Sequence, residues 1–200
     1  MSDANNMYER LSSPARHPRD ISVNGEGAEI IRTFSFIDLS GFTQYCAENG
    51  PAQAQIVLRS FRKLVRRICS QRGVRVSKWL GDGVMLVGSD PVSVVACCLD
   101  IVSRVQSDRL EIRGGVSTGP ALLLDGDDYT GRAVNLASRL CDASPSKSVY
   151  IDQDSAEGIP AWSTQTKCQA FDIKGIGLRS DIIELKLSDY SGLEVWDLGF

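Results

Sequence analysis

The stretch Val74-Arg-Val-Ser-Lys-Trp-Leu-Gly-Asp-Gly-Val-Met-Leu-Val87 decides the fold. Two apolar runs flank a Gly-Asp-Gly turn, which is typical of a β-hairpin because Gly and Asp adopt tight-turn backbone angles at little cost. Lys78 and Asp82 lie four positions apart around this turn. A carboxylate at a hairpin tip projects beyond the sheet, so Asp82 can meet an ion or a phosphate.

Composition narrows the class of protein. The chain has 200 residues, 42% of them hydrophobic, which suits one domain with a real core. No apolar run approaches the ~18 residues of a membrane span, and the N-terminal residues lack a signal-peptide core. We therefore expect a soluble, cytoplasmic protein with no membrane partner. With 22 basic and 25 acidic residues the net charge is -3, which argues against a nucleic-acid partner.

The metal-binding residue types are unevenly represented. His17 is the one histidine, so a His-based triad or a His-ligated metal is not expected. The six cysteines show no C-x-x-C spacing, which favours reduced, buried thiols over disulfides or a zinc site. Any metal should therefore have oxygen ligands, as magnesium, manganese and calcium prefer.

Hydrophobic periodicity predicts one folded domain over 30–187, between a mobile N-terminal arm (1–29) and a C-terminal tail (188–200). Strands are predicted at 30–39, 110–116, 121–124, 147–151 and 171–187, the last interrupted by Lys174-Gly175-Ile176-Gly177, and helices at 51–71, 91–105 and 133–141. With the hairpin, this order predicts an α+β fold. We expect a ferredoxin-like βαββαβ core, a mainly antiparallel sheet with helices packed on it, and additional C-terminal strands.

Polar residues cluster at the ends of these elements. Asp38 closes the first strand, and the Gly41-Phe42-Thr43 turn can aim backbone N–H groups at an anion, although many strand-to-helix turns look the same. Asn135 and Arg139 lie one helical turn apart on the same face. They could bind an anionic, hydroxyl-bearing ligand, or they could simply be polar residues on the surface. The acidic turn 125–128 could suggest calcium, but the EF-hand spacing is absent.

Three segments together resemble the catalytic domain of the class III nucleotidyl cyclases. They are Phe36-Ile-Asp-Leu-Ser-Gly-Phe-Thr43, Lys78-Trp-Leu-Gly-Asp-Gly83 and Asp128-Tyr-Thr-Gly-Arg-Ala-Val-Asn-Leu-Ala-Ser-Arg139. Each segment alone is a weak signal, whereas three in this order with this spacing are highly specific. The resemblance covers roughly residues 30–187.

The resemblance implies an adenylate cyclase that converts ATP to 3′,5′-cyclic AMP and pyrophosphate. Asp38 and Asp82 correspond to the family's metal ligands, which hold two Mg²⁺ or Mn²⁺ ions. Arg139 corresponds to the arginine that stabilises the transition state, and Asn135 to the residue that positions the ribose. The turn formed by Gly41, Phe42 and Thr43 corresponds to the phosphate-binding turn.

The same resemblance implies how the base is read and how the sites assemble. Lys78 and Asp128 correspond to the purine-reading pair, and an ammonium with a carboxylate complements adenine rather than guanine. Lys174, in an Asp-Ile-Lys-Gly turn, is similar to a lysine that contacts the terminal phosphates. The family forms head-to-tail homodimers with two shared sites. At each site, Asp38 and Asp82 would come from one subunit, and the other subunit would supply Lys78, Asp128, Asn135, Arg139 and Lys174.

Other interpretations of the same residues remain open. Taken singly, Asp82 and Asp128 are ordinary turn residues, Lys78 an exposed strand lysine, and Asp38 a helix cap. The chain could also be a catalytically weak cyclase-like module that binds nucleotide or a partner, or a guanylate cyclase. An unrelated metal-dependent phosphotransferase would need neither Lys78 with Asp128 nor Asn135 with Arg139.

Overall fold

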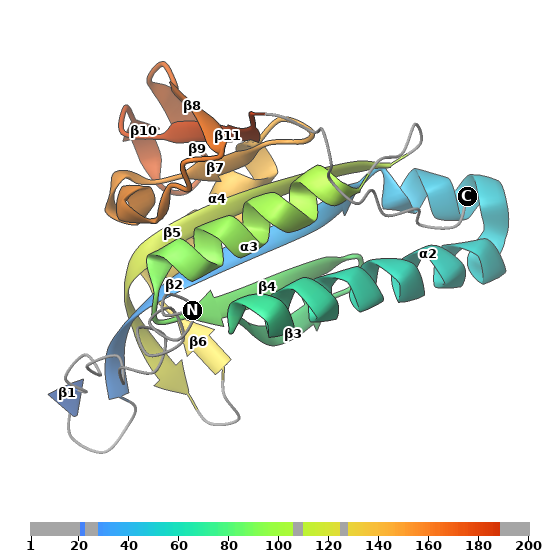
Figure 1. Cartoon of the computed structure of the whole chain (residues 1–200), viewed down its shortest axis with the longest axis horizontal. Coiled ribbons are helices and arrows are strands. Elements are labelled where there is room, and N and C mark those ends of the chain that lie inside the picture. Colours follow the sequence, from blue (N-terminus) through green and yellow to red (C-terminus); the bar gives the residue numbers. More distant parts are fainter. Residues whose placement is uncertain (1–20, 23–27, 106–109, 125–127, 189–200) are drawn as a thin grey trace, which may run out of the picture.

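A computed structural model describes residues 21–22, 28–105, 110–124 and 128–188 (Figure 1). The helices are α2 (Phe42–Arg72), α3 (Pro91–Arg104), α4 (Arg132–Ala143) and the 3₁₀ helix η1 (Gln153–Gly158). The strands are β1 (Ile21–Ser22), β2 (Ala28–Ser40), β3 (Arg75–Leu80), β4 (Gly83–Gly88), β5 (Glu111–Leu124), β6 (Asp128–Thr130), β7 (Val149–Ile151), β8 (Ser163–Lys167), β9 (Phe171–Ile173), β10 (Gly177–Arg179) and β11 (Ile183–Leu187).

One nine-stranded sheet organises the chain, with the order β3-β4-β2-β5-β7-β11-β8, while β1 joins β2 and β6 joins β5. Among the described strands, β5 and β7 form the one parallel pair. The first four strands of the path, with α2 and α3, have the order of a ferredoxin-like fold. The predicted α+β class, the antiparallel core and the C-terminal strands are confirmed.

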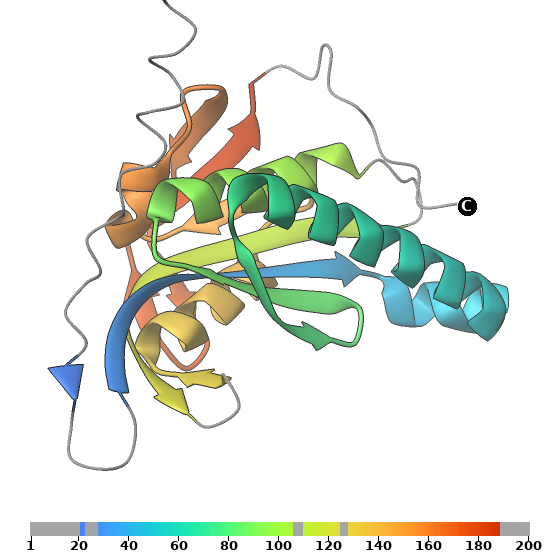
Figure 2. The ribbon, with the colours of Figure 1, turned by 60° about the horizontal axis from the view of Figure 1, so that its bottom comes forward.

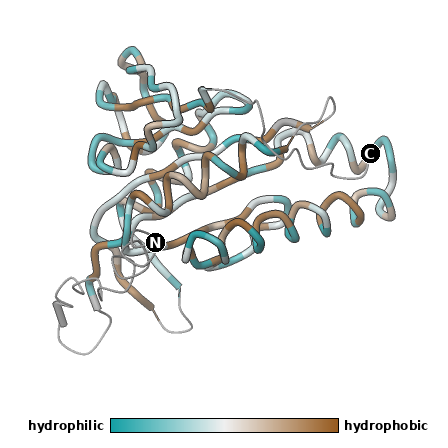
Figure 3. The backbone as a smooth tube through the Cα atoms, viewed as in Figure 1, coloured by the Kyte–Doolittle hydropathy of each residue, from teal (hydrophilic) through white to brown (hydrophobic). Residues whose placement is uncertain are grey.

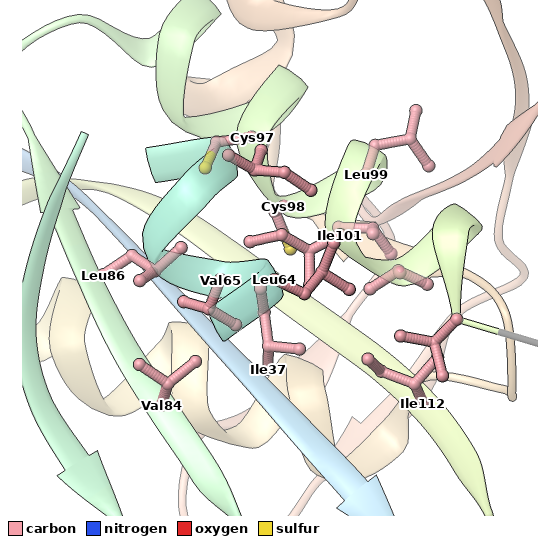
Figure 4. Packing of buried hydrophobic residues seen from close by; sticks show 14 of the residues in the cluster. Ile37, Leu64, Val65, Val84, Leu86, Cys97, Cys98, Leu99, Ile101 and Ile112 are labelled. Carbon is pink, nitrogen blue, oxygen red and sulfur yellow. The ribbon is translucent and has the colours of Figure 1, made fainter. Parts of the chain in front are cut away.

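Helices cover both faces of the sheet, as Figure 2 shows. The larger core lies between the sheet and α2 with α3, and includes Ile37, Leu64 and Leu86, which are at most 1% exposed (Figure 4). Burying each of these side chains contributes about 2 kcal/mol. A second core joins α4 to the opposite face, and α2 shows both hydrophobic and hydrophilic stretches because only one of its sides is buried (Figure 3).

The contact between α4 and β5 is unusually close. A Cβ at Gly115 would lie 2.2 Å from the backbone nitrogen of Cys141 and 2.3 Å from the carbonyl oxygen of Ala137. Gly115 therefore lets the backbone of α4 rest directly on the strand. On the other face, a Cβ at Gly114 would lie 2.5 Å from the Cys98 sulfur of α3.

One predicted boundary is wrong. The strands predicted at 110–116 and 121–124 are one continuous strand, β5, because Pro120 falls between the segments paired with β7 and β6, where a missing N–H donor costs less. The helix predicted from residue 51 is confirmed, because non-helical angles at Gly50 divide α2 just before Pro51, and a further helical segment precedes it from Phe42. The hairpin and the helices near 91–105 and 133–141 are confirmed.

Other predictions fall partly or wholly outside the described residues. These are the N-terminal arm, of which Ile21–Ser22 pair with β2, the C-terminal tail beyond residue 188, and the acidic turn at 125–127. Among the cysteines, Cys69, Cys97, Cys98 and Cys141 are buried as expected, whereas Cys46 and Cys168 are half-buried. No helix in the described ranges is long and apolar enough to cross a membrane.

Candidate active site

Asp38 and Asp82 lie close together at one end of the sheet. Asp38 is near the end of β2, and Asp82 lies in the turn between β3 and β4. Because β4 pairs with β2, a Cβ at Gly83 would lie only 3.1 Å from the Ile37 carbonyl and 3.5 Å from Asp38 Oδ1. The hairpin turn is thus pressed against the first carboxylate.

The electrostatics of Asp82 reflect this proximity. Partial burial raises the pKa of Asp82 above its ordinary value, a backbone hydrogen bond opposes the rise, and the negative charge of Asp38 adds to it. A carboxylate whose ionisation is disfavoured by burial and by a neighbouring carboxylate is a suitable place for a divalent cation. Among the described residues, no third His, Cys, Asp or Glu joins them in a ready metal site. Further ligands would come from water, the backbone or a phosphate.

Arg113, which sequence analysis missed, pairs with Asp38. It lies on β5 opposite Asp38, and its Nη2 is 3.3 Å from Asp38 Oδ2. Its Nη1 donates to the carbonyl of Asp142 at 2.7 Å, while its buried Nε has no hydrogen-bond partner in the structure. The signal in the sequence was a single cation inside an apolar strand, but only the sheet register places it beside Asp38.

Arg62 on α2, which was also not predicted as a site residue, contacts the hairpin that carries Asp82. Its guanidinium lies 5.0 Å from the ring centre of Trp79, and its Nη2 donates to the Gly81 carbonyl at 3.4 Å. Arg66 stacks on the same ring at 5.3 Å. Cation–π contacts of this kind contribute about 0.5–1 kcal/mol at exposed sites. They fix the strand that leads into Asp82.

The predicted phosphate turn forms the start of α2. Gly41 is the N-cap residue, and no side chain caps this helix end. Its first turn contains no acidic residue, so the backbone N–H groups and the helix dipole are available to an anion. Thr43 is exposed, and Phe42 packs partly against the core, which anchors the turn.

Lys78 and Asp128 form an ion pair although they are fifty positions apart. Lys78 lies on β3, and Asp128 begins β6; their side chains are 37% and 45% exposed. The hydrogen bond from Lys78 lowers the pKa of Asp128, and the backbone N–H of Tyr129 lowers it further. The predicted base-reading pair is therefore brought together within one chain.

Asn135 and Arg139 lie on α4 and open into a different pocket from the carboxylates. Their pocket has a volume of about 260 Å³ and also includes Gly175 and Ile176, next to the exposed Lys174. Asp38 lines a pocket of about 160 Å³ together with Ser138 and Asp142 of α4. Ser138 lines both pockets. Asp38 and Arg139 thus belong to two separate groups within one chain, while Lys78 and Asp128 line neither of these pockets.

Comparisons with known proteins identify the family of this chain. The family model for the adenylate and guanylate cyclase catalytic domain matches residues 29–182. An uncharacterized protein of Mycobacterium tuberculosis is 32% identical over 142 residues, which is 70% of this chain and 37% of that protein. An adenylate cyclase of Streptomyces coelicolor is 31% identical over 61% of this chain and 32% of its own length. The chain therefore spans only about a third of these relatives.

Solved structures show the same fold. The adenylyl cyclase CyaB from P. aeruginosa superimposes with a TM-score of 0.71 at 24% identity, covering 82% of this chain and 98% of that one. The guanylate cyclase domain of RhGC from Catenaria anguillulae, in complex with GTP, gives a TM-score of 0.71 at 20% identity. The match covers 80% of this chain and 97% of that one. By fold, motifs and family match, this chain belongs to the class III nucleotidyl cyclases, the family of adenylate and guanylate cyclase catalytic domains.

Proposed function

We propose that this chain is an adenylate cyclase that forms 3′,5′-cyclic AMP and pyrophosphate from ATP at sites shared by a homodimer. The observation that carries the proposal is the division of the site residues into two groups. The pockets beside Asp38 and Arg139 have volumes of 160 and 260 Å³, below the ~300 Å³ at which small-molecule sites usually begin. A second copy that places its Arg139 group over the Asp38 group would complete a nucleotide site.

Asp38 and Asp82 would hold two Mg²⁺ or Mn²⁺ ions. Their carboxylate oxygens are the donors these ions prefer. Burial, with a smaller contribution from the charge of Asp38, raises the pKa of Asp82, and a bound cation would stabilise the ionised form. Bound ions would make the ribose 3′-hydroxyl a stronger nucleophile and neutralise the triphosphate. Arg113, which pairs with Asp38, keeps positive charge beside this carboxylate.

The remaining residues would bind and orient ATP. The N–H groups at the start of α2, around Phe42 and Thr43, would bind phosphate oxygens. Asn135 would hold the ribose, and Lys174 the terminal phosphates. Arg139 would donate to the α-phosphate oxygens, where negative charge builds during the attack.

Lys78 and Asp128 would select adenine. The ammonium donates to a ring nitrogen of adenine, and the carboxylate accepts from its amino group. Guanine presents the opposite pattern at these positions, so the pair would meet donor with donor and acceptor with acceptor. Because the two side chains already contact each other, little reorganisation is needed on binding.

The direct test incubates the purified protein with ATP and Mn²⁺ and measures cyclic AMP and pyrophosphate, with GTP in a parallel reaction. We expect cyclic AMP with equimolar pyrophosphate and a clear preference for ATP. Preferential formation of cyclic GMP would reverse the base assignment. Nucleotide binding without either product would identify a catalytically weak module.

The shared-site arrangement has its own test. Asp38→Ala and Arg139→Ala homodimers should each lose at least about a hundredfold in kcat, because each lacks a group that acts in the transition state. Mixing the two variants should restore activity, since a heterodimer contains one site with neither substitution. If heterodimers form and every mixture stays inactive, the sites are not shared.

A further inference from the structure

Asp142 contacts both groups of site residues. Its carboxylate Oδ2 accepts a hydrogen bond from Arg139 Nη1 at 3.2 Å. Its main-chain carbonyl accepts one from Arg113 Nη1 at 2.7 Å, and Arg113 in turn pairs with Asp38 at 3.3 Å. Asp142 also lines the same pocket as Asp38. It is therefore a junction between the two groups, although no predicted motif contains it.

Helix stability does not explain an aspartate at this position. Asp142 lies in the last turn of α4, where the carbonyl end of the helix favours cations over carboxylates by about 0.3–1 kcal/mol. Burial does not explain it either, because the side chain is 58% exposed. The contact with Arg139 is the interaction that distinguishes Asp142 from a neutral residue.

The geometry suits a role in holding Arg139. The Arg139 side chain is 46% exposed and long, so it would otherwise sample many rotamers. One hydrogen bond through Nη1 restricts the guanidinium, which has five N–H donors in all. Arg113 meanwhile fixes the backbone that carries the Asp142 carboxylate.

We propose that Asp142 is a positioning residue that holds Arg139 in the orientation from which it engages the α-phosphate. This inference rests on the proposed function, in which Arg139 acts at the site built around the partner's carboxylates. Asp142 then serves the site that uses the Arg139 of its own chain, and not the site that uses its own Asp38.

The first test compares Asp142→Ala and Asp142→Asn with wild type. We expect kcat to fall up to about fivefold in the Ala variant, the range that exposed ion pairs span, with little change in KM. The kcat of the Asn variant should lie between those of wild type and the Ala variant, because the amide oxygen can still accept a hydrogen bond from Arg139. The melting temperature should stay constant or rise, since a charge unfavourable to the helix end is removed.

A matched control is Asp181→Asn, which weakens another ion pair, with Arg179, whose two residues line neither pocket. Its kcat should equal that of wild type. The proposal is overturned if Asp142→Ala leaves kcat unchanged, or if its loss of activity matches a loss of folded protein.

The decisive experiment uses the hybrid dimer of Asp38→Ala and Arg139→Ala chains, in which only the Asp38→Ala chain supplies a working Arg139. Adding Asp142→Ala to that chain should lower the hybrid rate by the factor seen in the homodimer. Adding it to the Arg139→Ala chain should change nothing. Equal losses from both placements would overturn the proposal, whereas an inactive parent hybrid would overturn the shared-site function and leave Asp142 to be judged by the single variants.

Discussion

In the proposed function, Lys78 and Asp128 select the base, so replacing both should alter the preference for ATP over GTP. In Lys78→Glu/Asp128→Asn, a carboxylate can accept from the guanine ring and amino N–H groups, and an amide can donate to its carbonyl oxygen. We expect kcat/KM for ATP to fall at least about tenfold, because each mismatched pair costs about 1–3 kcal/mol. The measurement is the ratio of kcat/KM for ATP to that for GTP.

The control for this substitution is the melting temperature, which should change little because both side chains are partly exposed. A double variant that is folded and still prefers ATP by the wild-type ratio would remove Lys78 and Asp128 from base reading.

Asp152 predicts a specific pH dependence of stability. Its side chain is buried, which raises its pKa above the ordinary 3.8, while hydrogen bonds from Ser117 and Ser155 oppose the rise. The folded state thus favours the protonated carboxyl of Asp152. Its contribution to the free energy of unfolding is complete below pH 3.8 and is lost as the pH rises through the raised pKa. Asp152→Asn does not titrate.

We therefore expect Asp152→Asn to be less stable than wild type, with a larger difference in melting temperature at about pH 4 than at about pH 7. Asp172→Asn, at an exposed carboxylate on β9, is the control for the change in net charge. A difference that grows toward neutral pH would show that the pKa of Asp152 is lowered instead.

At the level of single residues, the sequence predicted what local spacing encodes. Asp82 follows from its hairpin turn, and Asn135 with Arg139 from helical periodicity. Arg113 and Asp142 were missed because their roles depend on register and distance between segments: Arg113 matters because it lies opposite Asp38 across two strands. The residues adjacent to Arg113 in the sequence do not indicate that it pairs with Asp38.

Among the elements, the contact between α4 and β5 is the most sensitive to substitution. Gly115→Ala would place a methyl group 2.2 Å from the helix backbone, and backbone cannot rotate away as a side chain can. We expect a loss of at least about 3 kcal/mol in the free energy of unfolding. For a domain of this size that lowers the melting temperature by about 6–12 °C.

Gly119→Ala, on the same strand, is the matched control. Its methyl group would meet only the Ala133 Cβ at 3.3 Å, so a small relaxation should accommodate it. Equal melting temperatures for the two variants would show that α4 is not held against β5 as described.

Element boundaries were harder to predict than elements. The hairpin was clear because its turn chemistry and both apolar runs agree. The continuity of β5 was not, since Ser117, Gly119 and Pro120 indicate a loop when read locally. The strand persists because β2 pairs with it along its full length, so tertiary pairing overrides the local preference.

For the whole molecule, catalysis should depend on protein concentration. If each site needs two chains, dilution below the dimer dissociation constant must lower the activity per chain, which should follow the dimer fraction measured by analytical ultracentrifugation. Activity per chain that stays constant while the protein dissociates would show that a single chain suffices.

The division of the site into two groups could not be predicted from composition or periodicity. The family resemblance implied it, and the separate pockets of Asp38 and Arg139 support it. The sequence lists the side chains, but the order and register of the strands determine which of them lie close together within one chain.

The Lys78–Asp128 pair connects β3 with β6, whereas Asn135 and Arg139 belong to α4. In the proposed function, the choice of base therefore belongs to β3 and β6, whereas the arginine that stabilises the transition state belongs to α4. A lineage could drift from one purine to the other through changes in two strands, with its catalytic helix inherited intact.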